Sequence, residues 1–184
     1  MIIVLCRGST VALLGNEPIP KEDCKIEEIA WHLANINRYT GGAGGYSVAQ
    51  HAVLVSQLGE CCQFAKLKHD DHEAIIGDVA TPIKATVDHL GGGAWAKLEI
   101  SVASRLRRRY GLPTHLPKAV YQADVLARQI EVASLFPPET QRRFRAQGLE
   151  PIYGHKLHVE EVWDADRAFR NYLDAHIKLG GGIT

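Results

Sequence analysis

The sequence has no excess of charge of either sign, because 21 lysine and arginine residues balance 21 aspartate and glutamate residues. A chain without a basic excess is not drawn as a whole onto nucleic acid or an anionic membrane, so any polyanion must be bound locally. No apolar stretch approaches the roughly 18 to 20 residues that span a bilayer, and the opening run, Met1 to Leu5, is shorter than a signal-peptide core. These absences predict a soluble, cytoplasmic protein with no membrane partner.

Cysteine is scarce and poorly placed for structural chemistry. Of the four cysteines, Cys61 and Cys62 are adjacent, and no pair has the C-x2-C spacing of a zinc site. We therefore expect reduced thiols instead of a disulfide scaffold or a cysteine-based metal site. Histidine is more abundant, with nine residues in 184.

The length and the 46% apolar content suit one globular domain with one core, spanning residues 1–184. Apolar residues recur at helical spacing and strand signals are nearly absent, which predicts an all-α, compact, single-domain bundle. Ser47 with Gln50 resembles a capping box, and Thr81 is expected to cap a helix that Pro82 begins. We expect a charged linker over 139–155 and helices over the ranges 26–37, 47–59, 61–76, 82–90, 94–110, 117–136 and 164–178.

Four side chains are candidate metal ligands. His51 and Asp124 each lie on a mainly apolar helix, where a charged group needs a compensating partner. The pair His69 and Asp70 lies between them in the sequence, although such a dipeptide often arises by chance at a solvated helix end. Imidazole nitrogens and carboxylate oxygens together suit Co, Mn, Zn, Fe or Ni, and four ligands from three helices would leave positions open for water and substrate.

The pattern H…HD…D, here His51, His69-Asp70 and Asp124, resembles the signature of the HD-domain phosphohydrolases. The segments YSVAQHAVLVS, HDDHEAIIGDVATPIK and ADVLARQIE are similar to the small deoxynucleotidase branch of that superfamily. The resemblance covers roughly residues 24–135, with a C-terminal helical extension over 156–180. It implies an HD-domain helical bundle in which those four residues hold a divalent transition metal.

The same resemblance implies roles for further residues. Glu73 and Asp78 match the catalytic positions that follow the HD pair. The substrate-binding positions of the branch are matched by Arg38, Tyr39, Thr81 and Lys84. Three features depart from the branch: an aromatic Tyr39 where Trp is common, a short glycine-rich loop before His51, and a charged Lys68 where an apolar residue is usual.

The resemblance implies an enzyme that hydrolyses 2′-deoxynucleotides in a bacterial cell or a phage-infected host cell, and two reactions fit. We expect a dNTP triphosphohydrolase, with dATP first, aided by a second ion such as Mg²⁺ and acting as a homo-oligomer. The alternative is a 5′-deoxynucleotidase that acts on dNMPs. A non-catalytic binding module is a further alternative. The basic runs Arg105 to Arg109 and Arg142 to Arg145 could bind nucleic acid, but such runs are more often solvated helix ends.

Overall fold

The computed structural model describes residues 1–182, and these are mainly helical, which confirms the all-α prediction. A short antiparallel hairpin, β1 (Ile2–Val4) and β2 (Thr10–Ala12), precedes the helices. The helices of the described chain are, in order, α1 (Ile26–Asn35), the 3-10 turn η1 (Tyr39–Gly41), α2 (Val48–Gln57), α3 (Gln63–Leu67), α4 (Glu73–Ile76), α5 (Thr81–Gly91), α6 (Ala94–Arg109), α7 (Lys118–Leu135), α8 (Pro138–Ala146) and α9 (Ala165–Lys178).

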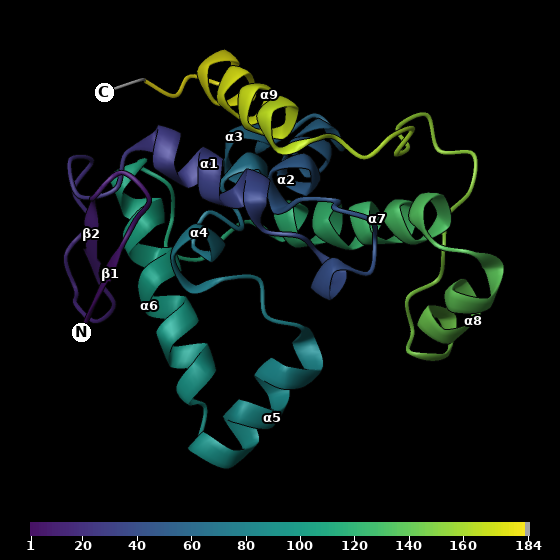
Figure 1. The fold of residues 1–184 in the computed structure, drawn as a ribbon, viewed down its shortest axis with the longest axis horizontal. Coiled ribbons are helices and arrows are strands. Elements are labelled where there is room, and N and C mark those ends of the chain that lie inside the picture. The colour runs from purple at the N-terminus through teal and green to yellow at the C-terminus, as the bar shows by residue number, and fades with distance from the viewer. Residues whose placement is uncertain (183–184) are drawn as a thin grey trace.

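Helices α1, α2 and α9 pack on one another, with α9 along the top edge of the view, and α7 packs against α2 and α3 (Figure 1). Helices α5 and α6 pair with each other and extend away from this body (Figure 1). Among the described residues, α5 buries no side chain, whereas α2 buries nine of its ten. Helix α2 is therefore the central element of the fold. No helix among residues 1–182 combines the length and apolar character required to cross a bilayer.

Helix α2 begins where the sequence predicts. The Ser47 side chain accepts a hydrogen bond from the Gln50 backbone N–H at 3.1 Å, which satisfies one otherwise unpaired amide of the first turn. The Gln50 side chain does not complete the capping box. Its amide instead donates to the Glu161 carbonyl at 2.8 Å and accepts from the Trp163 N–H at 2.9 Å. Gln50 thus fastens the segment before α9 to α2.

The single helix predicted over 61–76 is wrong, because the structure divides it into α3 and α4. Cys62 has a positive φ of 58°, and residues 68–72 form an irregular turn between the two short helices. Aspartate side chains compete for backbone hydrogen bonds and disfavour a helix interior, which explains a break at Asp70 and Asp71. The break moves His69 and Asp70 from a helix face to a turn that faces α2.

Three smaller expectations also differ from the structure. The segment 139–155 is not a plain linker, since α8 begins there with Pro138 in its first turn, a position that proline favours. Thr81 is the first residue of α5 instead of its cap, and Ala80 occupies the N-cap without a side-chain hydrogen bond. The hairpin strands are three residues each, too short to show a period-two pattern in the sequence.

The Arg105 to Arg109 run has a structural role at the end of α6. Three of its arginines donate to backbone carbonyls of the N-terminal segment: Arg105 to Ala12 and Glu17, Arg108 to Asn16, and Arg109 to Cys24. These contacts hold the segment between the hairpin and α1 against α6. Three arginines of the run are therefore engaged within the protein.

Candidate metal centre

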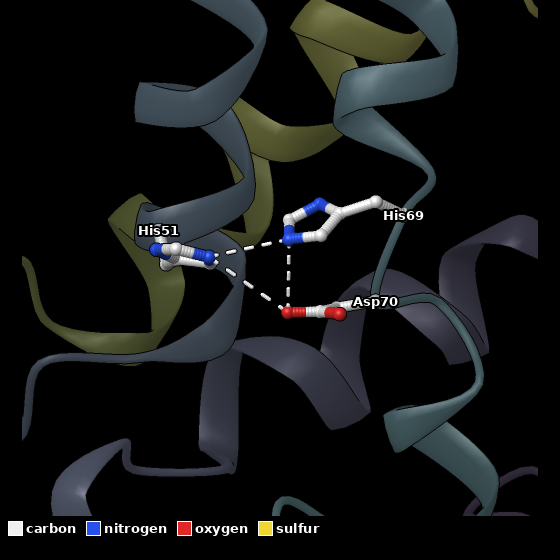
Figure 2. Close-up of side chains that lie close together, drawn as sticks. All are labelled: His51, His69 and Asp70. Carbon is white, nitrogen blue, oxygen red and sulfur yellow. Dashed lines mark hydrogen bonds and ion pairs between the residues drawn. The ribbon is translucent and has the colours of Figure 1, made fainter. Parts of the chain in front are cut away.

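The structure brings the four predicted metal ligands together. His51 comes from the second turn of α2, His69 and Asp70 from the turn after α3, and Asp124 from the second turn of α7. The two imidazole Nε2 atoms lie 3.3 Å apart, and Asp70 Oδ2 lies 3.0 Å from His69 Nε2 and 3.8 Å from His51 Nε2 (Figure 2). Asp124 Oδ1 lies 3.3 Å from His51 Nε2 and 3.9 Å from His69 Nε2.

The hydrogen bonds of the two rings show that this group fits a metal ion. His69 Nδ1 lies 2.7 Å from the Lys66 carbonyl, which can only accept, so Nδ1 carries the proton. His51 Nδ1 likewise donates to the Glu131 carboxylate. In the neutral rings both Nε2 atoms then present lone pairs to each other, an arrangement that a cation between them stabilises. The ligand atoms of His51, His69 and Asp70 lie close enough together to hold one metal ion.

Glu131 on α7 is the main residue that the sequence analysis missed. It is fully buried and accepts hydrogen bonds from His51 Nδ1, from Tyr39 Oη at 2.6 Å and from Tyr46 Oη at 3.0 Å. Arg38 Nε lies 3.6 Å from Glu131 Oε2, the oxygen that also accepts from Tyr39. A carboxylate that accepts from Nδ1 fixes the ring orientation and raises the basicity of Nε2.

A signal for Glu131 was present in the sequence. It lies seven residues after Asp124 on α7, about two helical turns, so both side chains lie on the same helix face. That face is lined by alanine and valine residues and is the one that packs on α2. A glutamate on a buried helix face requires a partner, and His51 on α2 supplies it.

The charges of the cluster shift its pKa values in opposite directions. Burial by itself raises the pKa of Glu131, but the charges of His51 and Arg38 and its hydrogen bonds lower it to about 2. Burial and Arg38 favour neutral His51, but Glu131 and Asp124 outweigh them and raise its pKa to about 9. Burial also disfavours ionised Asp70, yet the two imidazoles hold its pKa well below the usual range. Without a metal ion, a proton on an imidazole therefore supplies the positive charge that the carboxylates need.

A cavity of about 610 Å³ opens beside the cluster, and it collects the other predicted residues. Asp70 and Asp124 form part of its wall. All six sequence-predicted catalytic and substrate residues line it: Arg38, Tyr39, Glu73, Asp78, Thr81 and Lys84. The sequence analysis did not predict four further lining residues: Arg128 on α7, Phe144 on α8, and Gln147 and Leu149 just after α8.

Glu73 is the buried acid of this cavity. Its side chain is 4% exposed, and its Oε2 has no hydrogen-bond partner within residues 1–182. Burial, together with the nearby charges of Asp70 and Asp78, raises its pKa well above the usual range. A buried carboxyl with a free oxygen and a raised pKa is suited to exchange a proton with water or substrate.

His72 is buried beside the cluster. Its Nε2 lies 3.3 Å from Glu99 Oε1, and its Nδ1 has no partner in the described chain. Asp70, His72 and Glu73 form a second group whose ligand atoms are close enough for one ion.

The cations of the cavity are already paired. Lys84 Nζ lies 2.5 Å from Glu99 Oε1, and Arg128 Nη2 lies 3.4 Å from Asp124 Oδ2. Arg38 Nη1 lies 3.7 Å from Asp70 Oδ2, a distance typical of a loose ion pair. A phosphate that enters this cavity would therefore compete with carboxylates for the same cations.

Both the hydroxyl and the ring of Tyr39 are engaged within the protein. Its hydroxyl donates to Glu131, and its ring packs edge-on against Phe136 and Phe144, with centroids 5.1 and 5.9 Å away. Tyr39 also has a positive φ of 55°, which is uncommon for a non-glycine residue. Tyr39 thus helps to fix Glu131 and, through it, His51.

Comparison with known proteins finds relatives without an assigned activity. No family model matches the chain. Uncharacterized protein RCAP_rcc00048 of Rhodobacter capsulatus is 34% identical over 155 residues, which cover 74% of this chain and 76% of the relative. Uncharacterized protein YfdR of Escherichia coli is 37% identical over 112 residues, which cover 60% of each protein.

Replacing Asp124 with alanine is expected to weaken the binding of Co²⁺, Mn²⁺ or Zn²⁺ by about 100-fold or more, since it removes one donor and leaves Arg128 unpaired. Elemental analysis of protein purified with added metal measures the occupancy. Asp174→Ala, an exposed change on α9, is the control and should keep the metal. Full occupancy in Asp124→Ala would remove Asp124 from the centre.

Glu131→Gln keeps the size of the side chain but removes its charge. We expect metal affinity to fall by about 10- to 100-fold, the usual effect of losing a carboxylate behind a metal-binding histidine. Competition with a chelating dye gives the dissociation constant, and Glu139→Gln in the first turn of α8 is the control. An unchanged constant would show that Glu131 only stabilises the fold.

Proposed function

Because the chain belongs to the same family as uncharacterized protein RCAP_rcc00048 of Rhodobacter capsulatus, whose name assigns no activity, we propose a function from the geometry of its own site. The function is metal-dependent hydrolysis of 2′-deoxynucleotide phosphates by an HD-domain enzyme. One observation carries it: a single cavity places a buried acid, Glu73, and two cations, Arg38 and Lys84, beside the His/Asp cluster. The H…HD…D resemblance supports the same assignment.

The chemistry divides between the ion and the side chains. His51, His69, Asp70 and Asp124 would hold the ion, which when bound polarises a phosphoryl oxygen and lowers the pKa of water towards neutrality. Glu73 orients the attacking water and takes its proton at the free Oε2.

Around the phosphorus, the other side chains have simpler tasks. Asp78, in the wall of the cavity, directs the water or the sugar. Arg38 and Lys84 exchange their present carboxylate partners for the phosphate oxygens and neutralise the charge that accumulates there.

We propose a deoxynucleoside triphosphate, dATP first, as the preferred substrate, cut at the α-phosphorus into deoxynucleoside and tripolyphosphate. The size of the cavity, about 610 Å³, lies within the range of small-molecule sites and supports a ligand larger than a phosphate alone. The group Asp70, His72 and Glu73 supports a place for a second ion. Since one of its donors is an imidazole, an ion such as Mn²⁺ suits that group better than the expected Mg²⁺.

One observation favours the alternative, a 5′-deoxynucleotidase. The Arg105 to Arg109 run was expected to help neutralise a polyphosphate tail, yet three of its arginines bind the N-terminal segment instead. Only Arg107 of this run lines a second cavity, of about 250 Å³, that adjoins His69, Asp70 and Asp124. A monophosphate needs fewer cations, and those of the large cavity would suffice.

Self-association stays a prediction from the sequence.

Product analysis separates the two reactions. Purified protein is incubated with each dNTP and each dNMP in the presence of Co²⁺, Mn²⁺, Mg²⁺ or Zn²⁺, and the products are resolved by ion-exchange chromatography. The proposal expects deoxynucleoside and intact tripolyphosphate from dNTPs. Orthophosphate from dNMPs, with dNTPs untouched, would favour the 5′-deoxynucleotidase, and no product from either class would contradict both.

Glu73→Gln is expected to lower turnover by a factor of about 10² to 10⁴, the usual range for a positioned acid-base group, while the metal at the His/Asp cluster is kept. Turnover and metal content are measured on the same preparation, with Glu22→Gln on the exposed surface as the control. Near-normal turnover would reduce Glu73 to a structural carboxylate. Loss of metal together with activity would instead make it a ligand.

A further inference from the structure

Lys68, which departs from the usual apolar residue before the HD pair, is buried in an aromatic box. Its residue surface is 2% exposed. Its Nζ lies 4.5 Å from the ring centroid of Tyr172, 5.0 Å from that of Tyr110 and 5.7 Å from that of Phe64. Cation–π contacts of this kind favour a charged amine in a site that excludes water. The lysine is therefore built into the interior next to the metal ligands.

Two further polar groups complete the environment of Lys68. Its Nζ donates to the Tyr172 hydroxyl at 2.8 Å and lies 3.5 Å from Asp71 Oδ2. The Tyr172 hydroxyl in turn donates to Asp71 Oδ1. Asp71 is 1% exposed and Tyr172 is fully buried. Asp71 Oδ2 has no hydrogen-bond partner among the described residues, and the charge of Lys68 is its compensation. We call Lys68, Asp71 and Tyr172 the buried latch.

The latch flanks the metal ligands on both sides in the sequence, since Lys68 precedes His69 and Asp71 follows Asp70. Backbone hydrogen bonds of ordinary length close the two ends of the turn, from Lys68 N–H to the Phe64 carbonyl at 3.0 Å and from Glu73 N–H to the Asp70 carbonyl at 2.9 Å. Between them, the His69 nitrogen lies 3.4 Å from the Lys66 carbonyl and the Asp71 nitrogen lies 3.5 Å from the Lys68 carbonyl. Both distances are at the long limit of hydrogen bonding. Side chains can therefore add to the restraint on the middle of the turn, where the two ligands lie.

We propose that the buried latch positions His69 and Asp70. Helix α9, which supplies Tyr172, would then help to set the geometry of the metal site. Tyr172 is the only latch member outside the turn, and it connects the turn to α9, which packs on α1 and α2. His51 also comes from α2. Through Tyr172, the turn that carries His69 and Asp70 is thus connected to α9, which packs on α2, the helix that carries His51. The inference rests on the proposed metal binding by the cluster.

A purely structural role would also explain a buried ion pair, so the test must separate positioning from stability. Tyr172→Phe removes one hydroxyl and keeps the ring. Phe169→Leu, on the same helix, loosens the contact with the Trp31 ring but leaves the latch intact. Lys68→Met removes the buried charge. Its control is Lys178→Met, which removes an exposed lysine charge at the C-terminal end of α9 and touches no member of the latch.

The five proteins, wild type included, are titrated with Co²⁺ and followed by visible absorption, well below each melting temperature. We expect Tyr172→Phe and Lys68→Met to bind Co²⁺ at least about tenfold more weakly, with an altered absorption spectrum, and both controls to match the wild type within about twofold. Circular dichroism confirms folding, and if Lys68→Met fails to fold, Tyr172→Phe decides the result.

Wild-type affinity and spectrum in Tyr172→Phe would overturn the inference and leave the proposed metal binding intact. An equal loss in Phe169→Leu would also overturn it, because any loosening of α9 would then suffice. Failure of the wild type to bind Co²⁺ would overturn both the inference and the proposed function.

Discussion

Two imidazole rings approach each other at 3.3 Å between their Nε2 atoms, and much of the surrounding structure holds them there. Each ring is fixed from behind by an acceptor on its Nδ1, a backbone carbonyl for His69 and the Glu131 carboxylate for His51. Two carboxylates, Asp70 and Asp124, then meet the facing nitrogens. Groups of this kind are costly to bury unless every one has a partner. The demand for partners explains why the residues behind the cluster are as specialised as the cluster itself.

Glu131 has partners on several segments of the chain. It accepts from His51, Tyr39 and Tyr46 and lies beside Arg38, so it connects α2, α7 and the glycine-rich loop between α1 and α2. The same loop places Arg38 in the wall of the large cavity. The residues that orient the metal ligand and the residue that would meet a phosphate are therefore fixed by one buried carboxylate.

The two sides of the cluster have different characters. Behind it, α1, α2, α7 and α9 provide a rigid, buried scaffold. In front of it, the cavity is bordered by the start of α5 and by α8, and α5 buries none of its side chains. Catalytic sites commonly combine a rigid scaffold with more mobile borders, because the ligands must be held in place while the substrate must enter and leave. Helices α5 and α6 extend away from the body beside this cavity (Figure 1).

The sequence by itself determined the helical class, most helix positions and the four candidate ligands, because these depend on local patterns: apolar spacing, Ser47 as a cap, and acids or histidines on apolar helices. It did not determine the break between α3 and α4, the helix α8, or the partners Glu131 and Tyr172. Lys68 illustrates the reason. Besides Asp71 in the same turn, its charge is compensated by α9, more than 100 residues later, which supplies a hydroxyl and an aromatic ring. Compensation between distant segments leaves no periodic signal in the sequence, so only the tertiary structure could decide it.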